Sequence, residues 1–192
     1  MALQHPFTCL SVKAQKRAFP VMLVLTLGVM TTLGVLGKPL MTPAAPCGIL
    51  CFEFAGDLPN AQTMVASWGP RGQVYAGLNL GLDYLFLVAY SSCIGLGCVL
   101  VASALDPKAR FFAALGVVLA WLLFGAAVLD GIENYALIRV LLGAEDAGLP
   151  ALAWWCAASK FLIVIAGMLF AAVGSVMLVA AKFRPGREQP SQ

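Results

Sequence analysis

The chain has 192 residues, of which 61% are hydrophobic and 11% are charged, and its formal net charge is +3. Soluble domains are about 45–50% apolar and about 25% charged, so this composition excludes a water-soluble globular protein and predicts an integral membrane protein. Basic residues do not alternate with aromatic residues in any run, which gives no support for a nucleic-acid partner.

A helix needs about 20 apolar residues to cross a bilayer, and four charge-free stretches have roughly that length. They lie at 18–37, 84–105, 111–129 and 161–181. Where the helical pattern continues beyond them, the predicted spans become 18–37, 76–105, 111–138 and 154–181. We therefore predict an all-α protein, a polytopic four-helix membrane bundle, with residues 18–181 as its transmembrane domain.

Lys and Arg are concentrated on one side of this bundle, before the first span, between the second and third, and after the fourth. They are Lys13, Lys16, Arg17, Lys108, Arg110, Lys182, Arg184 and Arg187. The opposite side has Lys38, Arg71, Arg139 and Lys160. Because the cytoplasmic ends of membrane spans have the excess of Lys and Arg, both termini are predicted to be cytoplasmic, as a basic tail at 1–17 and a disordered tail at 182–192.

A cleavable signal peptide over residues 1–45 is the alternative for the first span. Its apolar core would be about as long as a full membrane span, which is longer than usual for a signal. A retained first helix is therefore favoured.

Residues 38–75 form the largest predicted segment outside the membrane. Its first part is rich in proline, which favours extended chain, whereas residues 49–68 are too apolar for a free loop. A short amphipathic helix is predicted over 59–68, with Asp57 or Asn60 near its start and Gly69-Pro70 at its end. We expect an extracytoplasmic cap that covers the helix ends or lies in the bilayer interface.

Each charge-free span ends on the outer side at a charged residue, namely Lys38, Asp83, Asp130 and Lys160. At a rise of 1.5 Å per residue, all four lie about 30–35 Å from the cytoplasmic charges, at one level near the outer edge of the hydrocarbon. Glu133 and Asn134 follow Asp130 at i+3 and i+4, so these three side chains share one helix face.

The charged layer contains more acids than it can pair with lysine. We expect Lys160 to pair with Asp130 or Asp83, with hydrogen bonds completed by Asn79, Asn134, Tyr84 and Tyr135. One carboxylate is then left over, which indicates a bound proton, a bound cation or contact with water. Charges that only mark the membrane boundary or fix the packing of helices also form such a layer. The candidate ligand-binding residues are Asn79, Asp83, Tyr84, Asp130, Glu133, Asn134 and Lys160.

Other chemistry has little support. Cys47 and Cys51 lie on the oxidising side and form a candidate disulfide, although either could instead reach Cys156. The chain has no Cys-x-x-Cys motif, and its one histidine, His5, lies on the cytoplasmic side. No catalytic residue, cofactor or metal site is predicted.

Four short motifs resemble those of a family of small bacterial four-helix membrane proteins. They are Ala66-Ser67-Trp68-Gly69, Leu82-Asp83-Tyr84-Leu85-Phe86, Leu129-Asp130-Gly131-Ile132-Glu133-Asn134 and Ser159-Lys160-Phe161. The resemblance covers the chain from the first span to the fourth. It implies a multi-pass protein of the bacterial inner membrane with the same architecture, and it implies no activity, because none is assigned to that family.

Three hypotheses for function remain open. The first is binding of a small amphiphile, a lipid headgroup or a cation between the cap and the charged layer. The second is a structural or assembly subunit in which the layer is a salt-bridge network. The third is proton or small-solute transport, which would require a homo-oligomer because the inner half of the four spans contains no acid.

Overall fold

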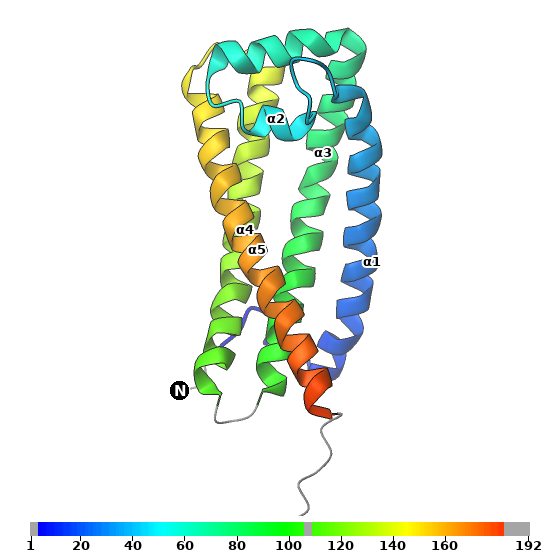
Figure 1. The fold of residues 1–192 in the computed structure, drawn as a ribbon, viewed down its shortest axis with the longest axis vertical. Coiled ribbons are helices and arrows are strands. Elements are labelled where there is room, and N and C mark those ends of the chain that lie inside the picture. Colours follow the sequence, from blue (N-terminus) through cyan, green and yellow to red (C-terminus); the bar gives the residue numbers. More distant parts are fainter. Residues whose placement is uncertain (1–3, 106–108, 183–192) are drawn as a thin grey trace, which may run out of the picture.

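The computed structural model describes residues 4–105 and 109–182, and these residues form helices and connecting turns. The elements in chain order are α1 (Val12–Gly37), the 3₁₀ helix η1 (Lys38–Leu40), α2 (Ile49–Glu53), α3 (Leu58–Ala104), α4 (Arg110–Leu141) and α5 (Gly148–Lys182). Figure 1 shows α1, α3, α4 and α5 running side by side along the length of the molecule.

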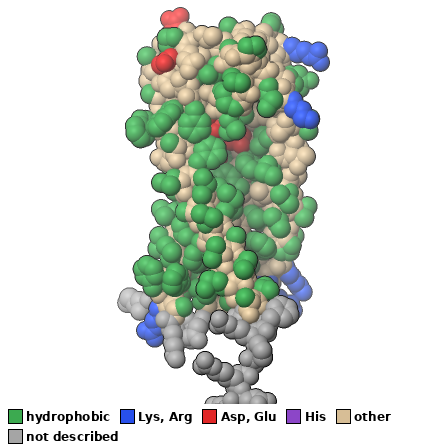
Figure 2. Space-filling view, in the orientation of Figure 1, with side chains coloured by type: hydrophobic (Ala, Val, Ile, Leu, Met, Phe, Trp, Pro, Cys, Tyr) green, Lys and Arg blue, Asp and Glu red, His purple; other side chains and the backbone are tan. Residues whose placement is uncertain are grey.

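Within the described ranges, α1, α3, α4 and α5 are each long and apolar enough to cross a membrane, which supports the predicted multi-pass helical membrane protein. The most apolar part of α3 is 61% buried, compared with 6% for α1, because α3 packs against the other three long helices. Large hydrophobic side chains cover much of the outer surface (Figure 2). Such a surface suits contact with lipid tails, which are as apolar as the side chains themselves.

The first helix begins earlier than the sequence pattern predicts. Residues 12–17 belong to α1 and not to a non-helical tail, because Ser11 caps the helix by accepting a hydrogen bond from the Ala14 backbone N–H at 3.2 Å. Gln15 then donates to the backbone carbonyls of Phe7 at 3.1 Å and Leu10 at 2.9 Å. These bonds fold residues 7–10 back onto the bundle, where Phe7 is buried.

A kink divides α3 into two parts. Asp57 caps its start by accepting from the Asn60 backbone N–H at 2.8 Å, as expected for a helix beginning near this residue. Gly69 then has φ 60° and ψ −179°, and Pro70 begins the second part. The first part lies across one end of the bundle, and the second part runs down its length (Figure 1). We call residues 38–69 the capping segment.

The capping segment has a core of its own that continues into the helix ends. The Trp68 indole N–H donates to the Leu40 carbonyl at 2.8 Å, and the Phe52 ring meets the Trp68 ring edge-on at 5.2 Å. Leu40, Phe52 and Trp68 are buried in one cluster with Leu80 of α3 and Leu137 of α4. The buried apolar residues of this segment are therefore covered by one another and by the bundle, whereas Met41, Leu50 and Phe54 are exposed. A disulfide joins Cys47 to Cys51, and Cys156 is buried as a free thiol.

Gly69→Ala is expected to lower stability, because the backbone region that Gly69 occupies is reached almost only by glycine. The expected loss is about 1–3 kcal/mol in free energy of unfolding, measured by denaturation in mixed micelles. Gly28→Ala is the matched control, since a Cβ there would meet nothing within 4 Å. Equal stability of the two variants would contradict the assigned kink.

Candidate functional site

Three carboxylates converge on one lysine beneath the capping segment. The Lys160 ammonium of α5 lies 2.6 Å from Asp130 Oδ1 and 2.8 Å from Glu133 Oε2, both on α4, and 3.8 Å from Glu53 Oε2 at the end of α2. We call Glu53, Asp130, Glu133 and Lys160 the buried charge cluster. It joins the capping segment to two of the long helices.

The cluster is almost closed to solvent. Asp130, Glu133 and Lys160 are 2%, 0% and 6% exposed, and the Glu53 side chain is 12% exposed. Phe54, the neighbour of Glu53, stacks on Phe161 with ring centroids 5.9 Å apart. Figure 2 shows only a small acidic area beneath the capping segment, surrounded by hydrophobic side chains.

The cluster has a surplus of negative charge. With all four groups ionised, three carboxylates against one ammonium leave a net charge of −2. Glu133 Oε1 and Glu53 Oε2 are buried and accept no hydrogen bond from the described residues. Since an unpaired buried charge costs several kcal/mol, the surplus must be neutralised or solvated. Burial raises the pKa of the Glu53 carboxyl above its ordinary value, although attraction to Lys160 acts in the opposite direction.

Asp83 takes a different partner. Its Oδ2 accepts a hydrogen bond from the Asn134 side-chain amide at 2.7 Å, and the structure shows no ion pair between Asp83 and Lys160 in the part of the chain it describes. Asn134 comes from the same turn of α4 as Glu133, so this pair adjoins the cluster. The buried Tyr90 hydroxyl lies next to Asp130 and has no hydrogen-bond partner among the described residues.

Asn79 and Tyr84 connect helices outside the cluster. Asn79 of α3 donates to the Leu33 carbonyl of α1 at 2.9 Å, and the exposed Tyr84 hydroxyl donates to the Gly131 carbonyl of α4 at 3.2 Å. Tyr135 does not join the layer, because its exposed hydroxyl accepts a hydrogen bond from Arg139.

Lys38 does not belong to the cluster, although its depth along α1 suggested a shared level. Its side chain is exposed, and it has no ion pair with a described residue. Lys160, in contrast, pairs with Asp130, one of the two partners expected for it. Depth in the membrane alone does not say to which side of a helix a charge points.

Sequence reasoning missed Glu53. It is the only charged residue between Ala44 and Gly56, in an otherwise apolar run. A single acid in such a run needs a partner or access to water, and this signal would have marked it as a candidate.

A metal ion does not fit the arrangement of side chains. Among residues 4–105 and 109–182, no three or more His, Cys, Asp or Glu side chains are placed to hold a metal ion together. The Lys160 ammonium itself takes the position between the carboxylates.

Comparison of the chain with protein-family models, with curated proteins and with solved structures found no match. The resemblance to the bacterial four-helix family therefore stays a prediction, and function has to be inferred from the site itself.

Proposed function

We propose that this multi-pass membrane protein binds protons at the buried charge cluster, and that Glu53 couples proton binding to closure of the capping segment. The observation that carries the proposal is the convergence of three carboxylates on Lys160, with oxygens of Glu53 and Glu133 that accept no hydrogen bond from any residue the structure describes. One proton lowers the surplus from −2 to −1 and a second removes it, and each proton also turns a carboxylate oxygen into a donor for its neighbour.

A proton suits this site better than a larger ligand. The cluster is almost closed, and none of its residues lines the 310 Å³ cavity found at the capping segment. A small amphiphile or lipid headgroup would have to displace Phe54 and the rest of α2. A proton needs no such space, and its uptake changes only the charges between groups already in contact.

The proposed orientation places the capping segment outside the cell and both termini in the cytoplasm of a bacterium, with the bundle in the inner membrane. The distribution of Lys and Arg supports it, because the loop between α3 and α4 and the flanks of α1 and α5 carry the basic excess. The start of α1 and the end of α5 lie at the end of the bundle opposite the capping segment (Figure 1). In this orientation, Glu53 would respond to the external pH.

The test is a pH titration by infrared spectroscopy, which detects the C=O band of protonated carboxyl groups. We expect the wild-type protein in detergent to show this band at pH values above 4.5, the ordinary pKa of a glutamate, and both Glu53→Gln and Glu133→Gln to reduce it. Because the pKa of Glu53 is raised, its proton is present below that pKa and is lost as the pH rises through it. The stability that this proton contributes should decrease as the pH rises from 4.5, the ordinary pKa of a glutamate, to the raised pKa of Glu53 in the folded protein.

Glu145→Gln is the matched control for this titration, because Glu145 is an exposed acid on the same side of the bundle. It should leave both the band and the pH dependence of unfolding unchanged. A wild-type protein that loses the band near pH 4.5, as exposed glutamates do, would contradict proton binding.

A structural or assembly role is the second candidate, and the closure of the cluster favours it. In that case the ion pairs hold α2, α4 and α5 together, and the surplus charge has no further role. Proton transport remains a third candidate and requires a homo-oligomer, since the end of the bundle away from the capping segment has no acid among the described residues.

A further inference from the structure

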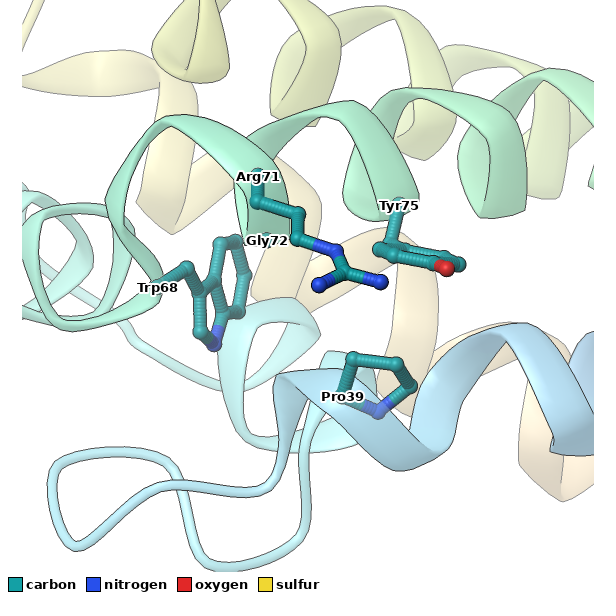
Figure 3. A pocket seen from close by; sticks show the side chains of 5 residues that line it. All are labelled: Pro39, Trp68, Arg71, Gly72 and Tyr75. Carbon is teal, nitrogen blue, oxygen red and sulfur yellow. The ribbon is translucent and has the colours of Figure 1, made fainter.

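A second site lies at the junction between the capping segment and the C-terminal end of α1. A cavity of about 310 Å³ is lined by Pro39 of η1 and by Trp68, Arg71, Gly72 and Tyr75 of α3. Figure 3 shows the Arg71 guanidinium extending between the rings of Trp68 and Tyr75, with Pro39 on the opposite side. It is separate from the buried charge cluster.

The walls of this cavity are held in place. Trp68 is fixed by its hydrogen bond to the Leu40 carbonyl at 2.8 Å and by the edge of Phe52. Gly72 must be glycine here, because a Cβ at that position would lie 2.8 Å from Trp68 Cβ. The site is therefore formed before a ligand arrives, which lowers the entropic cost of binding.

Arg71 carries a positive charge without an internal partner. Its side chain is exposed, and no carboxylate of the described residues lies within ion-pair distance of it. A guanidinium presents several N–H donors in a planar fork that matches a phosphate or carboxylate group. The chemistry of the cavity thus favours an anion, with aromatic walls for the apolar atoms attached to it.

The surroundings indicate that this anion belongs to a lipid. Pro39 lies at the end of the first candidate span, which runs from Val12 to Leu40, so the cavity is at the membrane boundary. On α3, an exposed apolar stripe runs away from Arg71 at i+3, i+7, i+14 and i+17. It consists of Val74, Leu78, Leu85 and Val88, which are 63%, 54%, 45% and 55% exposed.

We propose that the Arg71 cavity binds the phosphate group of an anionic phospholipid, whose acyl chains lie along the exposed stripe of α3. Arg71 holds the phosphate, and Trp68 and Tyr75 contact the glycerol and the first carbons of the chains. The site lies at the capping segment and does not depend on proton binding at the buried charge cluster.

In the experiment, lipid is added to the purified full chain in detergent, and the bound lipid is measured by native mass spectrometry. Phosphatidylglycerol is the anionic lipid, phosphatidylcholine is the zwitterionic comparison, and inorganic phosphate is the soluble competitor. We expect phosphatidylglycerol to bind more tightly than phosphatidylcholine, and Arg71→Gln to weaken its binding by about tenfold. Excess inorganic phosphate should not displace the lipid, because inorganic phosphate has no acyl chains to contact the apolar stripe.

Arg139→Gln is the matched control, since Arg139 lies at the same end of the bundle but is held by Tyr135 with its NH1 2.9 Å from the phenol oxygen. It should bind phosphatidylglycerol as the wild type does. Wild-type affinity in Arg71→Gln would overturn the proposal, as would equal binding of both lipids. Displacement by inorganic phosphate would show a site for soluble anions and overturn the assignment to a lipid. Thermal unfolding of both variants checks that each is folded.

Discussion

Lys160→Met is expected to destabilise the protein by about 3–5 kcal/mol, because it leaves buried carboxylates without their counter-charge. Met keeps most of the length of the side chain and removes only the ammonium that contacts Asp130 at 2.6 Å and Glu133 at 2.8 Å. The measurement is reversible unfolding in mixed micelles, together with size-exclusion chromatography to detect disassembly.

Lys38→Met is the control for this variant, since it removes an exposed lysine that pairs with no described residue. A Lys160→Met protein as stable as Lys38→Met would rule out a stabilising charge cluster. Adding Asp130→Asn and Glu133→Gln to Lys160→Met leaves Glu53 as the one acid of the cluster and should restore much of the lost stability, because replacing most of a buried ionic network by neutral groups often costs little stability.

The triple variant also separates the two leading functions. If it is stable and its C=O band is weaker than that of the wild type, the charges serve proton binding, and their structural role can be filled by neutral groups. If it stays unstable, the ion pairs themselves hold the capping segment, and a structural role gains support.

Phe52→Ala is the second change with a large expected effect. Phe52 is 0% exposed and contacts Trp68, so its removal leaves a cavity in the core of the capping segment. Truncation of a fully buried phenylalanine costs about 3–5 kcal/mol. Since α2 also carries Glu53, we expect the segment to open locally and to be cleaved faster by proteases between residues 41 and 57.

Leu50→Ala is the matched control, because Leu50 lies on the same helix and is 47% exposed. It should leave both the unfolding transition and the cleavage rate near those of the wild type. Equal cleavage rates for Phe52→Ala and Leu50→Ala would show that Phe52 does not hold the segment closed. Opening in Phe52→Ala should also hydrate Glu53 and bring its pKa back toward its ordinary value.

The sequence predicted the long helices well, because bilayer thickness sets how many apolar residues a span requires. The helix face of Asp130, Glu133 and Asn134 also followed from spacing alone, since 3.6 residues per turn place i, i+3 and i+4 together. All three are buried in the structure. The start of the amphipathic helix after Asp57 was visible from local chemistry, as a side chain able to cap the first N–H groups.

Only the tertiary structure decided which charges meet. Depth along each span placed Lys38, Asp83 and Lys160 at one level, yet Lys38 is exposed and Asp83 takes Asn134 as its partner. In a membrane helix, both the lipid-facing and the buried face are apolar, so the sequence pattern does not report how the helix is rotated about its axis.

The path of the capping segment was likewise decided by packing between distant residues. The glycine at position 69 lets the chain turn from the end of the bundle into the long second part of α3. The Trp68–Leu40 hydrogen bond holds this turn against the end of η1. This path of the chain brings Glu53 close to Lys160 and Arg71 close to Pro39, although the residues of each pair are far apart in the sequence. Local propensities act over a few residues, whereas these two sites depend on contacts across the whole bundle, which only the folded chain brings together.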